Sequence, residues 1–186
     1  MTFLDRRLQD RRILAARRWL RRDDRVLDVG CADGALFQRL RWLRNGVGID
    51  PMAEPRVVGR SHQVVRGNFP HDVGPCERFD AIVALAVFEH IPQSESGRFA
   101  QACRDHLRAD GRVVITVPSP VVDRALHWLM RLRLVDGMEV HQHWGLQPSD
   151  VSPIFEEQGL RLLHHRRFEL GVNHLFVFGA PGPARA

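Results

Sequence analysis

The stretch VLDVGCADG at residues 26–34 places a run of small residues directly after an apolar segment. Gly30, Ala32 and Gly34 carry almost no side chain, which lets the chain turn sharply and lets a ligand approach the backbone. Asp50 ends the next apolar segment, twenty residues after Gly30, and a carboxylate there can accept hydrogen bonds from both ribose hydroxyls. We therefore expect a nucleotide-type cofactor at this loop; the alternative is a tight turn followed by a surface aspartate.

Glu89 and His90 are a second set of candidate catalytic residues. They follow the apolar run FDAIVALA at residues 79–86. An imidazole that titrates near neutral pH suits a general base, and the neighbouring carboxylate can orient it or contact a substrate. The alternative is that the pair stabilises its loop beside the cofactor without taking part in chemistry. The chain contains neither lysine nor tyrosine, so two other acid/base groups are excluded.

A third group of candidates lies in residues 119–148, which interrupt the apolar pattern. His141 and His143 point the same way if their stretch is extended. We rank them first as polar groups of a substrate pocket and further catalytic candidates, second as loop structure, and third as metal ligands. Trp144 can form an apolar wall or simply pack, and His127 falls in an expected helix that can line a lid.

The remaining pattern predicts strands and helices in alternation, which favours a parallel sheet with right-handed crossovers. Ser149 is the expected cap of the last helix. The expected strands are 25–30, 46–50, 62–67, 79–86 and 112–118, the helices are 3–21, 35–43, 96–107, 121–132 and 149–158, and an antiparallel hairpin pairs 160–170 with 174–180.

The length of 186 residues fits one domain, 1–186, with a basic N-terminal helix at 1–24 and an insert at 119–148. No apolar stretch is long enough to cross a membrane, and no signal-peptide segment is present, so we expect a cytoplasmic protein. The three cysteines have no metal-site spacing, which predicts reduced thiols in or near the core. We expect no bound metal.

Positive charge is concentrated at the N-terminus. Residues 1–25 hold nine arginines and four aspartates, a surplus of five, whereas the rest of the chain has eighteen of each sign. Such a segment can touch nucleic acid or an acidic membrane surface. The favoured alternative is a solvated helix face, because Leu4, Leu8, Ala15 and Trp19 can share the opposite face.

These motifs together resemble the class I S-adenosylmethionine-dependent methyltransferases, especially the small-molecule group related to ubiquinone-biosynthesis methyltransferases. VLDVGCADG resembles the family's first motif, usually D-x-G-x-G-x-G, with Ala32 in place of the middle glycine. RGNFP at 66–70, FDAIVALAVFEHIP at 79–92 and LRADGRVVITVPSP at 107–120 resemble later motifs in the expected order. The implied fold is an α/β, Rossmann-like, doubly wound and mostly parallel sheet with an antiparallel C-terminal hairpin strand.

The resemblance also assigns roles to residues around the cofactor. It places the first motif around the methionine part, Asp50 on the ribose hydroxyls, and Asn68, where the family often has Asp, on the adenine edge. Related ubiquinone O-methyltransferases have Glu-x-x-Glu-His at the position of Glu89 and His90, a pattern implicated in metal binding. Ala86 replaces the first glutamate here, so we predict no metal. The full expected cofactor set is Asp28, Gly30, Cys31, Ala32, Gly34, Asp50, Pro51, Met52, Asn68, Phe69, Ala84 and Leu85.

The implied reaction is methyl transfer from S-adenosylmethionine to a small organic acceptor, with a hydroxyl as the first choice and S-adenosylhomocysteine as the product. Glu89, His127 and Trp144 are the expected substrate contacts. Nucleic acid is not the expected partner, and the oligomeric state stays open. Two alternatives remain: a nicotinamide-dependent oxidoreductase, which also uses a glycine loop and an acid, and a non-catalytic cofactor-binding module that docks through its basic helix. The C-terminal hairpin favours the methyltransferase.

Overall fold

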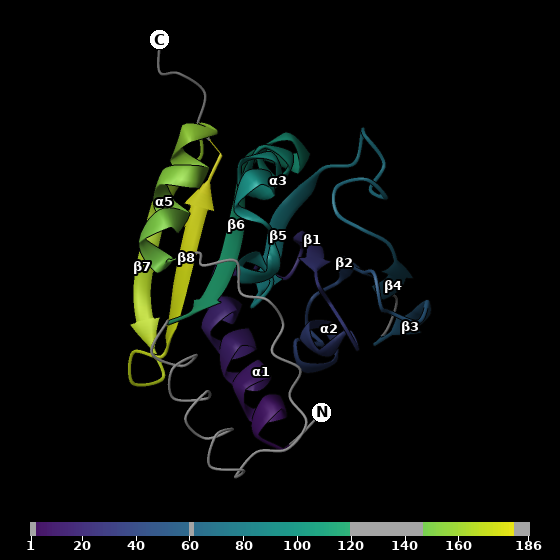
Figure 1. The fold of residues 1–186 in the computed structure, drawn as a ribbon. Helices are drawn as coiled ribbons and strands as arrows, with labels where there is room; N and C mark the ends of the chain where they lie inside the picture. The colour runs from purple at the N-terminus through teal and green to yellow at the C-terminus, as the bar shows by residue number, and fades with distance from the viewer. Residues whose placement is uncertain (1–2, 60–61, 120–146, 181–186) are drawn as a thin grey trace.

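The computed structural model describes residues 3–59, 62–119 and 147–180, in which helices and strands alternate (Figure 1). The helices are α1 (Phe3–Ala16), η1 (Arg17–Trp19), α2 (Ala35–Arg39), η2 (Phe88–His90), α3 (Gln93–His106) and α5 (Pro148–Glu157). The strands are β1 (Arg25–Val29), β2 (Asn45–Asp50), β3 (Arg56–Val58), β4 (His62–Arg66), β5 (Phe79–Leu85), β6 (Leu107–Pro118), β7 (Arg161–Phe168) and β8 (Asn173–Gly179).

The strands of the described residues form one sheet in the order β3-β4-β2-β1-β5-β6-β8-β7. β4, β2, β1, β5 and β6 run parallel to one another. β8 returns antiparallel to β6, and β7 pairs antiparallel with β8. The sequence-based prediction of a doubly wound, mostly parallel sheet with an antiparallel C-terminal hairpin is therefore confirmed.

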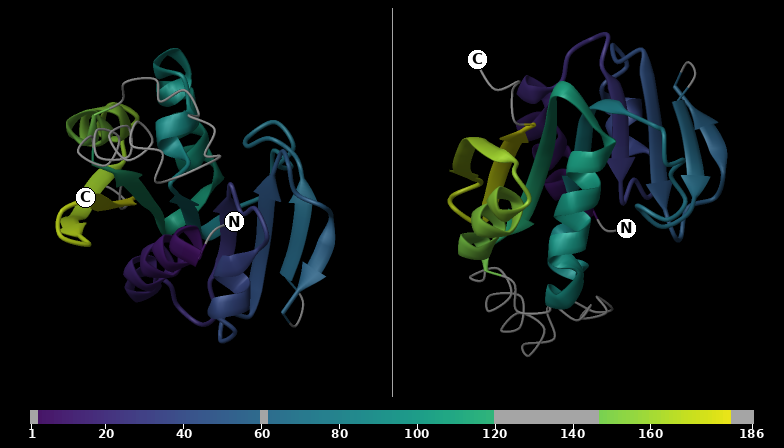
Figure 2. Two further views of the ribbon diagram at one scale, coloured as in Figure 1. Left: turned by 60° about the horizontal axis from the view of Figure 1, so that its bottom comes forward. Right: turned by 90° about the horizontal axis from the view of Figure 1, so that it is seen from above.

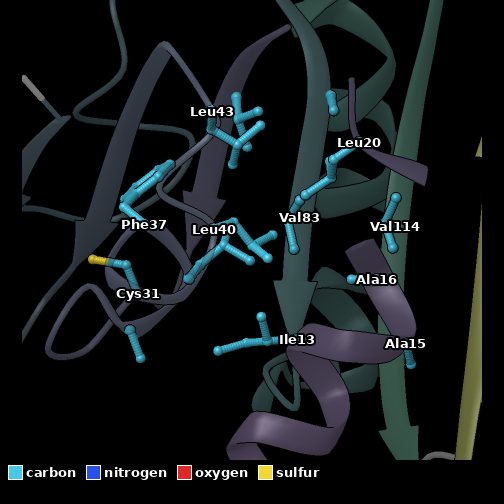
Figure 3. Packing of buried hydrophobic residues seen from close by; sticks show 14 of the residues in the cluster. Ile13, Ala15, Ala16, Leu20, Cys31, Phe37, Leu40, Leu43, Val83 and Val114 are labelled. Carbon is cyan, nitrogen blue, oxygen red and sulfur yellow. The ribbon is translucent and has the colours of Figure 1, made fainter. Parts of the chain in front are cut away.

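Helices cover both faces of the sheet, so alternate residues of each central strand point into two separate cores (Figure 2). On one face, Ile13 of α1 and Phe37 of α2 pack with Val83 and Val114 (Figure 3). On the other face, Phe99 of α3 and the helix α5 cover the opposite side chains of the same strands. Burial on both faces explains why the central strands read as nearly continuous apolar runs.

Two glycines of β2 make room for the segment that follows β1. A side chain at Gly46 would collide with the Phe37 ring, and a Cβ atom at Gly48 would lie 2.7 Å from the Cys31 sulfur. These glycines therefore let α2 and the loop before it lie flat against the sheet. The position of the glycine-rich loop thus depends on the sequence of the neighbouring strand.

Several element boundaries differ from the predicted ones. Helix α2 ends at Arg39 rather than residue 43, because Leu40 leaves the helical region, although Leu40 and Leu43 are both buried. The short edge strand β3 was not predicted. The Ser149 cap is wrong: Gln147 is the N-cap of α5, and its backbone N–H donates to the Asp150 carboxylate at 2.9 Å, while Pro148 occupies the favoured first helical position.

The N-terminal helical segment packs on the sheet, but its apolar residues are not confined to the buried side, since Leu14 is 55% exposed. Ile13, Ala15, Ala16 and Leu20 are buried, and Trp19 is partly buried. None of the helices in the described segments is long and apolar enough to span a membrane.

A buried ion pair fixes the end of this helical segment to the middle of the sheet. The Arg112 guanidinium on β6 donates to the Asp24 carboxylate and to the Trp19 carbonyl oxygen. The side chains of Arg112 and Asp24 are only 8% and 6% exposed. Burial lowers the pKa of Arg112, and the Asp24 charge opposes this shift. Removal of either partner would leave a desolvated charge.

We predict that Asp24→Ala lowers the free energy of unfolding by about 3–5 kcal/mol, the usual cost of leaving one partner of a buried pair uncompensated. The double variant Asp24→Leu/Arg112→Met should lose much less, because no charge stays buried. Urea denaturation measures both values. Equal losses in the single and double variants would contradict this account.

Candidate functional site

The glycine-rich loop between β1 and α2 is held by backbone hydrogen bonds to the adjacent strand. The Gly30 N–H donates to the Ile49 carbonyl at 2.8 Å, and the Gly34 N–H donates to the Cys31 carbonyl at 2.7 Å. Gly30 and Gly34 have φ values of 70° and 71°, a conformation that glycine adopts without steric cost. The loop is therefore preorganised by its own backbone.

Ala32 occupies the position where the resembled motif has its middle glycine, and its φ is 45°. An L-residue in this left-handed region costs roughly 1–2 kcal/mol. The left-handed backbone thus explains why the motif has glycine at this position. In this chain Ala32 adopts that conformation with some strain, at an exposed position of the loop. The small methyl group still leaves the loop surface open.

Gly30 has a further physical reason beside its left-handed backbone. A Cβ atom on Gly30 would collide with the Cγ2 methyl of Val87, in the segment after β5. The absent side chain therefore gives space to another part of the protein, while the approach of a ligand to this backbone stays a prediction. Val87 was not identified from the sequence, because only the folded chain brings it under the loop.

Asp50 links the loops that follow β1 and β2. Its carboxylate accepts the Ala32 N–H at 3.0 Å and the Met52 N–H at 2.7 Å. Pro51 and Met52 are exposed, with Met52 85% exposed. The predicted ribose-binding carboxylate and the predicted adenine-side residues thus lie next to the glycine-rich loop, at the carboxyl edge of the parallel strands where ligands of such sheets bind.

Asp28 lies inside the protein directly before the loop and is 4% exposed. Burial, followed by the negative charges of Asp50 and Asp33, raises its pKa to about 8. A carboxyl group in this position is protonated at neutral pH unless a positive charge approaches it. Asp28 can therefore respond to a cationic group bound at the loop.

The cysteines are only partly as predicted. Cys31 and Cys103 are buried, but Cys76 is exposed, so the expectation that all three lie in or near the core is wrong for Cys76. Burial, followed by the charges of Asp28 and Asp50, raises the pKa of the Cys31 thiol to about 12. Its sulfur packs toward Gly48 of β2, so Cys31 contributes its backbone, and not its side chain, to the surface of the loop.

The other expected cofactor residues lie on neighbouring strand ends. Asn68 is exposed after β4, and its backbone N–H donates to the Asp72 carboxylate at 2.8 Å. The Phe69 ring packs against Phe99 of α3 with ring centroids 5.3 Å apart. At the end of β5, Ala84 is fully buried and Leu85 is partly buried, each among different core residues.

Glu89 and His90 lie in η2, directly after β5, with Glu89 6% exposed and His90 exposed. The guanidinium of Arg12 on α1 is close enough that the Glu89 charge opposes the burial that lowers the pKa of Arg12. Arg12 also donates to the Asn173 amide oxygen at 3.5 Å. Sequence reasoning missed Arg12, since nothing in an arginine-rich helix distinguishes one arginine from the others.

A chain of polar side chains at the same edge of the sheet was also missed. The Ser119 hydroxyl lies 3.0 Å from His174 Nε2, and His174 Nδ1 lies 3.0 Å from His165 Nε2. Ser119 also donates to the Gly171 carbonyl at 2.9 Å. These bonds fasten the β7–β8 turn to the end of β6. No spacing rule joins residues so far apart in sequence.

His127, His141, His143 and Trp144 fall at residues 120–146, outside the described residues, and their roles stay predictions. Across the described segments, no group of three or more His, Cys, Asp or Glu side chains is placed to hold a metal ion.

Comparison with known proteins identifies the family of this chain. The family model described as a methyltransferase domain matches residues 2–165. A ubiquinone biosynthesis O-methyltransferase of Cronobacter sakazakii is 31% identical over 157 residues, covering 75% of this chain and 63% of the relative. One from Glaesserella parasuis is 32% identical over 106 residues, covering 50% and 44%. The chain spans about half the length of such curated relatives.

Solved structures share the fold at low sequence identity. Magnesium protoporphyrin IX methyltransferase from Synechocystis, solved with bound S-adenosylhomocysteine, has a TM-score of 0.67 and 14% identity, covering 97% of this chain and 89% of its own. A putative methyltransferase of Haloferax volcanii, in complex with the activator Trm112, has a TM-score of 0.69 and 13% identity, covering 98% and 95%. The chain belongs to the methyltransferase-domain family, with the fold of class I S-adenosylmethionine-dependent methyltransferases.

We predict that Gly30→Ala lowers the free energy of unfolding by about 2–4 kcal/mol, from left-handed backbone strain plus overlap with Val87. In a Val87→Ala background the same change should cost only about 1–2 kcal/mol, because the overlap is gone. Denaturation of the four proteins in this cycle gives both costs. The same cost in both backgrounds would show that Val87 does not explain Gly30.

The raised pKa of Asp28 predicts a specific dependence of stability on pH. Between about pH 4 and 8 the folded protein holds a proton on Asp28 that the unfolded chain has lost, so stability falls as pH rises. Relative to Asp28→Asn, the wild type should lose up to about 1.4 kcal/mol per pH unit in this window. Parallel pH profiles for the two proteins would contradict the assignment.

Proposed function

We propose that this protein binds S-adenosylmethionine at the Gly30–Gly34 loop and transfers its methyl group to a hydroxyl of a small organic acceptor. The observation that carries the proposal is the Asp50 carboxylate, held beside this loop by the Ala32 and Met52 N–H groups. The family membership supports the reaction class. The names of the ubiquinone biosynthesis O-methyltransferases support oxygen as the methylated atom.

Different residues of the chain would hold the nucleoside end and the methionine end of the cofactor. Asp50 accepts hydrogen bonds from the ribose hydroxyls, and exposed Pro51 and Met52 lie on the adenine side with Asn68. The backbone of the glycine-rich loop surrounds the methionine part. Asp28 beneath the loop becomes ionised as the cationic methionine end approaches, because a nearby positive charge lowers the pKa of a carboxyl group.

Methyl transfer from a sulfonium is an in-line displacement, so the protein's main contribution is to position the acceptor and exclude water. The acceptor oxygen attacks the methyl carbon, the carbon–sulfur bond breaks with its electron pair on sulfur, and the hydroxyl proton must leave. His90 follows β5 at the edge where the acceptor would lie, and its exposed imidazole can take that proton. Glu89 is buried in the same turn, where its charge acts on the Arg12 guanidinium.

The activity can be tested with S-adenosylmethionine labelled in its methyl group and catechol as a simple hydroxyl acceptor. We expect label in methylated catechol and one S-adenosylhomocysteine for each methyl transferred. A protein that binds S-adenosylmethionine yet transfers label to neither catechol nor the compounds of a cell extract would be the binding module. Preferential binding of NAD would favour the oxidoreductase.

We predict that His90→Ala slows turnover by roughly 10²–10⁴-fold, the contribution of a general base, while the affinity for S-adenosylmethionine persists. His71→Ala, which removes another exposed imidazole, is the matched control and should leave turnover unchanged. Turnover that survives in His90→Ala would rule out this histidine as the base and favour catalysis by positioning alone.

A further inference from the structure

A groove of about 720 Å³ lies between α1 and the end of β7. Apolar side chains line it on both sides. Leu8 and Leu14 come from α1, Phe168 comes from β7 and Leu170 follows β7. Leu14 is 55% exposed and Leu170 is 106% exposed, which is costly for large apolar side chains unless something covers them.

Two contacts outside the groove lining fix the N-terminal helical segment against the β7–β8 hairpin. The Trp19 and His164 ring centroids lie 5.1 Å apart. On the side of α1 away from the groove, Arg12 donates to Asn173, and the Asn173 amide donates to Glu169 at 2.6 Å. The helix and the hairpin therefore cannot simply close on each other, and the groove is preformed.

Four arginines line the groove together with one acid. Arg7 and Arg11 come from α1, Arg18 comes from η1 and Arg166 comes from β7, and the Glu169 carboxylate accepts a hydrogen bond from the Asn173 amide. Among the residues that the structure describes, no ion pair or side-chain hydrogen bond involves any of these four guanidinium groups. The lining therefore carries four guanidinium groups against one carboxylate, a surplus of positive charge.

The groove is separate from the cofactor site. At 100° per residue, positions 7, 11 and 14 share one side of α1, and Arg18 of η1 lines the same groove. The opposite side carries Arg12, which faces the segment after β5, and Gln9, which reaches Asp33 of the glycine-rich loop at 3.5 Å. The same helix therefore presents one face to the site and a second face to the outside.

We propose that this groove binds an acidic amphipathic segment of a partner protein. Arg7 and Arg18 are eleven residues apart, which places them about 16 Å apart along the helix. Cations spread over that length match carboxylates spread along a peptide rather than one compact anion. The leucines and Phe168 between them match an apolar stripe, as in recognition of a helix by a groove. A nucleic acid would offer charge but no such stripe.

The test uses a fluorescein-labelled, fourteen-residue synthetic helix with glutamates flanking a leucine stripe, and a shuffled peptide of the same composition. Fluorescence anisotropy should show saturable binding of the patterned peptide, at least about tenfold tighter than the shuffled one. The double charge reversal Arg11→Glu/Arg18→Glu should weaken binding by about tenfold or more, since two attractions become repulsions. Leu14→Asp should weaken it as well.

Arg161→Glu is the matched control, because Arg161 is exposed on β7 outside the groove, and it should leave peptide binding unchanged. All variants should keep the wild-type melting temperature and cofactor affinity, so a loss of peptide binding reports the groove. Equal binding of the shuffled peptide, no binding, or insensitivity to the arginine reversal would overturn the proposal. Tighter binding of a DNA duplex or of phosphatidylglycerol vesicles at the same arginines would also overturn it.

Discussion

The carboxylate of Asp50 is the connection on which the site depends, because it joins the two loops that must act together. It accepts one backbone N–H from the glycine-rich loop at Ala32 and one from the loop after β2 at Met52. A carboxylate with two such bonds is fixed in direction before a ligand arrives. Its bond to Ala32 also helps hold that residue in a left-handed conformation that alanine does not favour, so the group that we propose for ligand recognition also shapes the loop.

The packing around this connection explains how a short loop stays open. Gly48 of β2 gives space to the Cys31 sulfur, and Gly30 gives space to Val87. The loop is therefore supported from below by β2 and by the segment after β5, and small residues are needed for contacts within the protein. Asp28 is buried by the same packing, which is why its pKa is high. The site combines a rigid backbone with one carboxyl group whose ionisation a cationic ligand can change.

The order of strands and helices, the reversed hairpin and the loop with its distal acid could be predicted from the sequence, because each follows from local apolar periodicity or short spacing. Contacts between distant segments could not. Val87 under Gly30, Arg12 beside Glu89, and the bonds from Ser119 to His174 each join residues that only the sheet topology brings together. The sequence also did not predict the helix ends that are set by a hydrogen bond between a backbone group and a side chain, as at the N-cap of α5.

The central claim is that the loop after β1 and the carboxylate at the end of β2 form one cofactor site. Titration calorimetry of S-adenosylmethionine into the wild type and into Asp50→Ala tests it most directly, with Asp50→Asn as the variant that keeps one acceptor oxygen. We expect saturable binding to the wild type and a loss of roughly 1.5–3 kcal/mol in Asp50→Ala, the worth of hydrogen bonds to a charged group, with Asp50→Asn in between. Unchanged affinity in a folded Asp50→Ala protein would contradict the account.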